Sequence, residues 1–170
     1  MSILKIVKYG NPVLREKGEL IDRIDKNILK LIDDMCETML NAPGLGLAAP
    51  QVEKNLSLFV LDMSYFDENG ECVAFINPEI IEQKGISAQE EGCLSVPGIN
   101  EEIKRPEYVK ISALDINGKE FQIEGTGLLA RAIMHEYDHI QGILIVDRLS
   151  SLKRKLIASK LKRISREEQV

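Results

Sequence analysis

The sequence contains few residues of three types: it has no tryptophan, two histidines and three cysteines among 170 residues. A small and odd number of cysteines does not predict the disulfide framework of a small secreted domain. The chain begins without a leader-like apolar segment, and no apolar run is long enough to cross a membrane. These absences predict a cytoplasmic protein with reduced cysteines and no membrane association.

Positive charge is not in excess either, because 22 lysines and arginines stand against 27 aspartates and glutamates and the net charge is −5. A chain without a basic surplus has no general attraction for nucleic acid, so we expect no recognition of a specific nucleic-acid sequence. Hydrophobic residues make up 44% and charged residues 29%, which is typical of a globular protein. The length predicts a single domain over residues 1–170.

Three stretches of the chain have the spacing of helices. Apolar residues recur at helical intervals over 25–41, where Met35 and Met39 are expected to lie in the core, and a second helix is predicted over 125–141. A third, amphipathic helix is predicted within about 150–170. Its apolar face consists of Leu152, Leu156, Ile157, Leu161 and Ile164.

Short apolar runs between polar neighbours predict strands at 58–61 and 72–76. Asn117-Gly118 is a strong hairpin signal and predicts paired strands at 108–116 and 119–123. Helices and hairpins in this order, without alternating βα units, favour an α+β fold. We expect small antiparallel or mixed sheets packed around the second helix, with an additional C-terminal helix.

The cysteines are far apart in the sequence. Cys36 lies beside the apolar stripe of the first helix and is expected to be a small buried hydrophobic residue, and Cys72 is expected to be a strand residue without a chemical partner. Cys93 follows Gly92 and precedes residues 96–98, Val-Pro-Gly, which predict a turn.

The two histidines are four residues apart, and a glutamate directly follows the first. Residues i and i+4 of a helix lie on the same face, so His135 and His139 can reach one metal ion. Glu136 is then close enough to exchange a proton with a water molecule at that ion. The H-E-x-x-H pattern in a predicted helix therefore indicates a metal-dependent hydrolase.

A catalytic metal site of this kind needs a third protein ligand and leaves a fourth position open. One class of protease continues the pattern with a third histidine, but Ile145 occupies that position here. The downstream carboxylates Asp147, Glu167 and Glu168 are poorly placed candidates. Upstream, Cys93 would complete a set of one thiolate and two imidazoles. A lone cysteine is more often a buried structural residue, so both interpretations stay open at this point.

A third segment, 44–51, follows the first predicted helix and reads Gly-Leu-Gly-Leu-Ala-Ala-Pro-Gln. Its glycines and alanines have so little side-chain bulk that a substrate or a neighbouring strand could lie against the backbone. Taken alone, such a segment is most often a tightly packed turn.

Together, these segments resemble the peptide deformylase family. The family's motifs are G-x-G-L-A-A-x-Q, E-G-C-L-S and H-E-x-D-H, and they are found here in that order at 44–51, 91–95 and 135–139. The similarity in organisation extends over essentially the whole chain. Met134 replaces a glutamine that is usual in the family and Ile140 replaces a leucine, and both changes are expected to affect packing only.

The resemblance implies removal of the formyl group from the N-terminal formyl-methionine of nascent polypeptides, with release of formate. It implies that Glu136 acts as general base and then as general acid. The Gln51 side-chain amide and the Leu94 backbone N–H are implied to stabilise the oxyanion of the transition state. The implied metal ligands are Cys93, His135 and His139.

The same resemblance implies a cofactor and a substrate pocket. The cofactor is one divalent metal ion per chain, Fe(II) in the cell, with zinc, nickel or cobalt able to occupy the site, although the ligand set alone would suggest zinc. The implied pocket for the methionine side chain is formed by Leu45, Gly46 and Leu128, yet apolar residues of this kind are usually only core.

Two carboxylates near the implied site have alternative roles. Glu91 and Asp138 could each orient a metal ligand. Asp138 could equally be a surface carboxylate, and for Glu91 we favour a structural ion pair with Arg105.

The predicted C-terminal helix is rich in lysine and arginine. On composition alone this is a solvated helix face, but the resemblance implies docking to the ribosome through such a helix. Three other functions compete with deformylation: an endopeptidase, a binding module without catalysis, and a structural metal site. The missing third histidine, the intact catalytic positions and the lack of a fourth ligand argue against them in turn.

Overall fold

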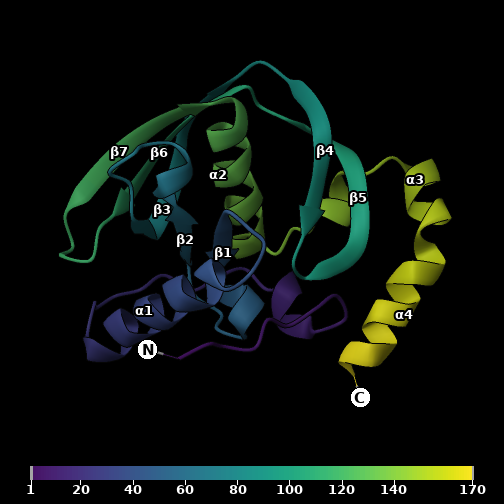
Figure 1. Cartoon of the computed structure of the whole chain (residues 1–170), viewed down its shortest axis with the longest axis horizontal. Helices are drawn as coiled ribbons and strands as arrows, with labels where there is room; N and C mark the ends of the chain where they lie inside the picture. The colour runs from purple at the N-terminus through teal and green to yellow at the C-terminus, as the bar shows by residue number, and fades with distance from the viewer. Residues whose placement is uncertain (1, 170) are drawn as a thin grey trace.

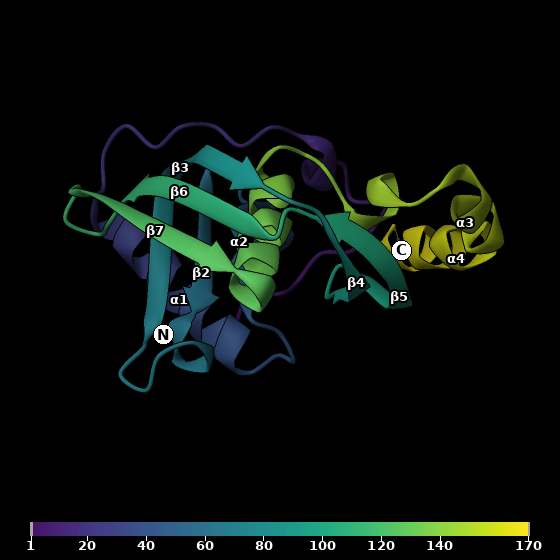
Figure 2. The ribbon, with the colours of Figure 1, turned by 90° about the horizontal axis from the view of Figure 1, so that it is seen from above.

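The helix that carries both histidines, α2 (Gly127–Ile140), lies between two antiparallel sheets, as Figures 1 and 2 show. The structure is a computed structural model and describes residues 2–169, so the two ends of the predicted domain, residues 1 and 170, lie outside the described residues. The larger sheet has the strand order β1-β2-β3-β6-β7, and the smaller sheet pairs β4 with β5.

The strands of the larger sheet are β1 (Gly46–Ala48), β2 (Leu58–Asp62), β3 (Cys72–Lys84), β6 (Tyr108–Leu114) and β7 (Glu120–Thr126). The smaller sheet consists of β4 (Ser87–Cys93) and β5 (Val96–Arg105). The other α-helices are α1 (Lys26–Leu40), α3 (Ser151–Leu156) and α4 (Ala158–Glu168). Short 3-10 helices are formed by Pro12–Arg15, Ala49–Val52, Met63–Tyr65 and Ile145–Arg148.

The predicted α+β fold with a central helix is confirmed. Every pair of neighbouring strands in the described part of the chain is antiparallel, and the one parallel contact there is an isolated bridge between Glu19 and Leu56. The term "mixed" therefore does not apply to these sheets. The smaller sheet was only partly foreseen, because β4 and β5 contain many charged residues and lack a clear apolar run.

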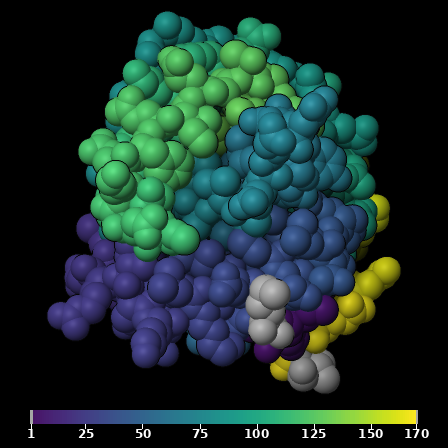
Figure 3. Space-filling view, turned by 60° about the vertical axis from the view of Figure 1, so that its left-hand side comes forward, coloured from purple at the N-terminus to yellow at the C-terminus, as the bar shows by residue number. Residues whose placement is uncertain are grey.

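Strand β2 explains why helices cover both faces of the larger sheet. All five of its residues are buried, and side chains alternate between the two faces of a strand. Phe59 and Leu61 pack in the cluster that contains α2, whereas Leu58 and Val60 pack in the cluster that contains α1. Figure 3 shows the α1 side, where purple and blue N-terminal segments lie beneath the teal and green strands.

Helix α1 begins at Asp25, whose side chain accepts a hydrogen bond of 3.0 Å from the Ile28 backbone N–H. This contact satisfies one of the backbone donors left free at a helix start. Met35 and Met39 are buried against the sheet, as predicted from the spacing of apolar residues. The helix positions the segment that follows it, which enters the site through β1.

A disulfide joins Cys36 of α1 to Cys72 at the start of β3, with their Cα atoms 6.0 Å apart. The expectation that both residues lack a chemical partner is therefore wrong. The two residues are 36 positions apart and meet only because α1 packs across the strand pair β2–β3. Cys93 is left as the free thiol.

Of the two turns predicted from the sequence, one is confirmed and the other is wrong. The hairpin around Asn117-Gly118 is confirmed, with β6 and β7 in register from Leu114 opposite Glu120 and Gly118 at a φ of +78°. The turn expected at 96–98 is wrong, because these residues form the start of β5. The chain reverses one step earlier, at Leu94 and Ser95, so Cys93 lies at the last position of β4.

The C-terminal helix is not continuous, because α3 and α4 meet at a break at Ile157. Ile157, Leu161 and Ile164 are buried in a cluster with residues of β5, but Leu152 and Leu156 are exposed. The prediction of one apolar face is thus wrong for the first turn, since the break changes the direction in which the earlier side chains point. Figure 1 shows α3 and α4 lying outside the smaller sheet.

Candidate active site

The metal-binding pattern lies in the second half of α2. His139 is fully buried and His135 nearly so, and their rings are 5.1 Å apart from centroid to centroid. The helix ends one residue later at Ile140, and two residues further on Gly142 has a φ of +77°, where a Cβ atom would lie 2.7 Å from the Arg15 carbonyl oxygen. Only glycine fits this position, which directly follows the helix cap Gln141.

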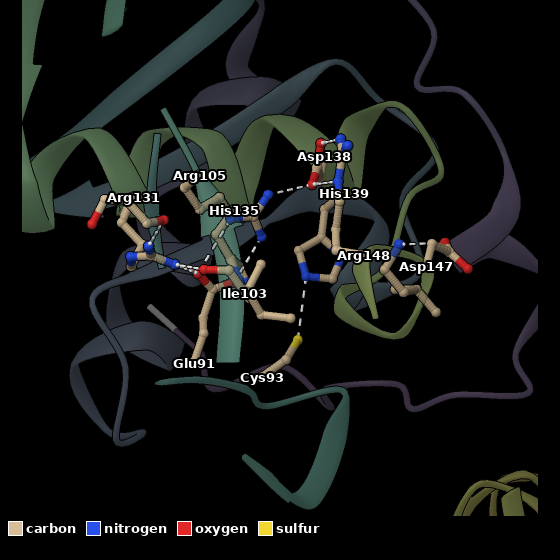
Figure 4. A network of polar contacts seen from close by, with 12 residues as sticks. Glu91, Cys93, Ile103, Arg105, Arg131, His135, Asp138, His139, Asp147 and Arg148 are labelled. Carbon is tan, nitrogen blue, oxygen red and sulfur yellow. Dashed lines mark hydrogen bonds and ion pairs between the residues drawn. The ribbon is translucent and has the colours of Figure 1, made fainter. Parts of the chain in front are cut away.

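The third potential ligand comes from the smaller sheet. The Cys93 Sγ atom is 3.3 Å from His139 Nε2, and the donor atoms of Cys93, His135 and His139 all lie within 4.8 Å of one another. Figure 4 shows the thiol pointing at the imidazole from below the helix. The hairpin β4–β5 therefore brings Cys93 to the two histidines, a contact between residues more than 40 positions apart.

The downstream carboxylates lie elsewhere. Asp147 pairs with Arg15 and accepts a hydrogen bond from the Leu144 N–H, and Glu168 contacts the Asn11 side chain. None of the three candidates belongs to the group of potential ligands that the described residues form.

These residues fit a divalent metal ion. A thiolate and two imidazoles that converge from two elements are the donor set of a catalytic zinc-type site, and Cys93 and His135 both line the neighbouring cavity. Burial keeps the pKa of His139 well below its ordinary value, which favours the neutral form that binds a metal, whereas at His135 burial is outweighed by Glu136, Cys93 and Glu91, which raise the pKa well above its ordinary value. The His139 Nδ1 atom is buried and has no hydrogen-bond partner among residues 2–169.

Glu91 makes contacts that suit both of the roles considered for it. It forms the expected ion pair with Arg105, at 2.7 Å, and its other contacts include His135 Nδ1, also at 2.7 Å. Burial raises the pKa of this carboxyl, but the His135 hydrogen bond and the Arg105 guanidinium outweigh it and hold the pKa well below its usual range. The charged carboxylate thus orients His135 so that Nε2 faces the site.

Asp138 is not a surface residue. It is buried and accepts hydrogen bonds from Arg105 on β5 and from Arg148 after α2. The two acidic residues and Arg105 therefore form one buried network alongside the helix, and Figure 4 labels its members. The Asp138 contacts place Arg105 so that it can also reach Glu91.

Glu136 lies at the wall of a cavity of about 420 Å³ beside the potential ligands. Its side chain is buried, its Oε1 atom has no hydrogen-bond partner in the described part of the chain, and burial raises its pKa to about 7. Gly46 faces it, and a Cβ atom there would lie 2.8 Å from Glu136 Oε2. The small residues of the 44–51 segment therefore make room for this carboxyl group.

Gln51 is buried next to the thiol. Its Oε1 atom accepts a hydrogen bond of 3.0 Å from the Ala48 N–H, which turns Nε2 toward Ser95 Oγ at 3.2 Å and Cys93 Sγ at 3.9 Å. Leu94 follows Cys93 in the turn and also lines the cavity. Both potential oxyanion donors therefore belong to residues that line the cavity together with Cys93.

The residues expected to bind substrate all line the same cavity: Leu45, Gly46 and Leu128. Several lining residues were missed in the sequence, among them Arg131, which is buried and bonded to Glu91. Its position four residues before His135 places it on the same helix face, a signal that was available but could equally have indicated a surface arginine.

The fold and this arrangement define a class of enzyme, the hydrolases with a H-E-x-x-H helix and a third ligand from a separate strand. A family model described as "Polypeptide deformylase" matches residues 3–155. The chain belongs to the peptide deformylase family, whose members remove the N-formyl group from nascent polypeptides during protein biosynthesis.

Individual peptide deformylases are similar to this chain over nearly its full length. The peptide deformylase of Thermodesulfovibrio yellowstonii is 51% identical over 162 residues, which is 95% of this chain and 98% of that protein. The crystal structure of a peptide deformylase from Legionella pneumophila superposes with a TM-score of 0.89 at 42% identity, covering 99% of this chain and 98% of that one. A peptide deformylase from Synechococcus elongatus, solved in complex with actinonin, has a TM-score of 0.86 at 39% identity, covering 92% and 87%. Within residues 2–169, no helix is long and apolar enough to span a bilayer.

Proposed function

We propose that this protein hydrolyses the formyl group of the N-terminal formyl-methionine of nascent polypeptides at one divalent metal ion held by Cys93, His135 and His139. The observation that carries the proposal is the convergence of these three side chains, within 4.8 Å of one another, beside a cavity lined by Glu136. An ion in this ligand set would polarise the formyl carbonyl and lower the pKa of a water molecule.

Glu136 supplies the proton transfers. With its pKa raised to about 7 by burial, the carboxyl group can both accept and release a proton near neutral pH. It takes a proton from the attacking water and then gives one to the amine nitrogen as the C–N bond breaks. The exclusion of larger side chains at Gly46 keeps room for this carboxyl group at the cavity wall.

Gln51 and Leu94 stabilise the negative charge that develops on the formyl oxygen. The Gln51 amide is held by its bond from the Ala48 N–H, so its NH₂ group is directed before the substrate binds. The Leu94 backbone N–H lies at a tight turn next to Cys93. A preorganised donor of this kind is typically worth about 3 kcal/mol in the transition state.

The cavity accepts the methionine side chain against Leu45, Gly46 and Leu128. Leu128 is 53% exposed in the free protein, and an unbranched apolar side chain would cover it. Fe(II) is the proposed ion in the cell, and zinc, nickel or cobalt would fit the same donors.

The nascent substrate places the protein at the ribosome in the cytoplasm. The surface of α3 and α4 carries basic side chains, among which Arg154, Lys155, Lys162 and Arg166 border a depression next to Tyr9. These cations suit a phosphate backbone, so we propose docking to ribosomal RNA through this surface, without sequence specificity.

The test is formate release from a formyl-methionyl peptide by protein purified without oxygen and loaded with Fe(II). We expect turnover by the natural chain and a loss of at least about 100-fold in the Glu136→Ala variant, because the general base is removed. The metal content of both proteins is measured alongside. Full metal loading without turnover by the natural chain would refute the proposed activity.

A further inference from the structure

Arg131 is a buried arginine in the turn of α2 that precedes His135, and among residues 2–169 its side-chain hydrogen bonds all go to the smaller sheet. Its Nη1 atom donates to Glu91 Oε1 and to the Ile103 carbonyl, each at 3.0 Å, and its Nη2 atom donates to the Ser87 carbonyl at 2.9 Å. One guanidinium thus contacts the start of β4 and residues near the ends of β4 and β5. Figure 4 shows it at one end of the polar network.

The hairpin β4–β5 and helix α2 are joined by polar contacts at three levels. Arg131 forms the first, the Glu91–His135 hydrogen bond the second and the Arg105–Asp138 ion pair the third. The two arginine contacts therefore flank the contact that orients a metal ligand. Because Cys93 belongs to the hairpin and both histidines belong to the helix, the geometry of the ligand set depends on how these two elements are held together.

Glu91 is fixed by two guanidinium groups. Its Oε1 atom accepts from Arg131 Nη1 and Arg105 Nε, and its Oε2 atom accepts from Arg105 Nη2 and His135 Nδ1. Arg105 is shared with Asp138, so Arg131 is the only cation in this network that pairs with Glu91 alone among the described residues.

We infer that Arg131 is a positioning residue for the metal centre that acts through Glu91: it fixes the Glu91 carboxylate against His135 and so keeps the hairpin that carries Cys93 in place against α2. This inference rests on the proposed metal site. Without the guanidinium, the buried Ile103 carbonyl and the partly buried Ser87 carbonyl lose this donor, and Glu91 keeps only its bonds to Arg105 and His135. Partners of a ligating histidine typically change metal affinity by about 10–100-fold, and an effect near the lower limit is expected here.

The experiment measures zinc affinity by chelator competition and the absorption spectrum of the cobalt-substituted protein, with thermal unfolding recorded in parallel. Arg131→Met keeps the aliphatic stem and removes the guanidinium. We expect about 10-fold weaker zinc binding and altered cobalt bands at a temperature where the variant is fully folded. Arg15→Met, which removes an exposed ion pair with Asp147, is the matched control and should bind zinc like the natural chain.

A double-mutant cycle separates positioning from general stability. If Arg131 acts through Glu91, then Arg131→Met should add little to the loss of zinc affinity already caused by Glu91→Gln. Additive losses, or a lower melting temperature with unchanged zinc affinity and cobalt spectrum, would overturn the inference.

Should Arg131→Met not fold, Arg131→Lys carries the test. A lysine ammonium keeps the charge but cannot reach all three acceptors in fork geometry, so weaker zinc binding is expected, and affinity equal to that of the natural chain would overturn the inference. If the natural chain itself bound neither zinc nor cobalt, the proposed metal site would fail and this inference with it. Tight binding by the natural chain and by the Arg131 variant alike would sink the inference alone.

Discussion

Replacing both Cys36 and Cys72 by alanine should lower the free energy of unfolding by about 4 kcal/mol under oxidising conditions. The disulfide closes a loop with a sequence separation of 36 residues. In the chain-entropy treatment, a cross-link of that length removes about 13 cal/mol/K of entropy from the unfolded chain, which is about 4 kcal/mol at 25 °C. For a chain of this size the same change corresponds to a fall of about 10 °C in Tm.

The closed loop contains β1, β2 and the 3-10 helix that carries Gln51. The cross-link thus restrains the segment from which the cavity receives Leu45 and Gly46. In a cytoplasm kept reducing by thiols, the two cysteines would form a dithiol and this part of the stability would be absent.

The assay is urea unfolding of the natural chain and of the Cys36→Ala/Cys72→Ala variant, both saturated with zinc so that metal binding contributes equally. With a slope of about 2 kcal/mol per M urea, the midpoints should differ by about 2 M. Adding a phosphine reductant should move the natural chain toward the variant and leave the variant unchanged.

Thiol counting provides the independent check. Denatured but unreduced natural protein should take up one alkyl group, at Cys93, and three after reduction. Three reactive thiols before reduction, or equal unfolding free energies for the two oxidised proteins, would show that the disulfide or its entropic effect has been misjudged.

Two further predictions concern the proposed reaction and its location. Gln51→Ala should lower kcat by about 100-fold with little change in zinc affinity, because the amide contacts the developing oxyanion rather than the ion; a kcat near that of the natural chain would assign Gln51 a packing role. Lys155→Glu/Lys162→Glu, which alters two exposed residues on α3 and α4, should weaken salt-sensitive ribosome binding and spare turnover of short peptides, and unchanged binding would exclude this surface.

The spacing of residues in the sequence was enough to locate helices α1 and α2 and to place both histidines on one face of α2. The i, i+4 separation of His135 and His139 determines that both rings lie on one helix face wherever the helix is placed, since the helical period is a property of the backbone. The same holds for Met35 and Met39 in α1, where apolar periodicity predicted the buried face.

Contacts between distant segments could not be obtained in this way. From the residues alone, Cys93 was one of several candidate ligands, and only the resemblance of three ordered motifs favoured it. Its approach to His139 depends on the hairpin β4–β5. The strands of this hairpin are rich in charged residues, and its turn was predicted at 96–98 instead of at Leu94 and Ser95. The Cys36–Cys72 disulfide was missed for the same reason, because nothing near either cysteine in the chain indicates which element will lie opposite.

The sequence by itself determined the α+β fold class, the H-E-x-x-H helix and, through motif order, the peptide deformylase family. Only the tertiary structure decided that Glu91 serves both Arg105 and His135, that Arg131 joins the helix to the hairpin, and that the C-terminal helix breaks at Ile157. Periodicity and motifs reflect interactions between residues that are close to one another in the sequence. Buried ion pairs, by contrast, depend on how separate elements pack, which no local pattern specifies.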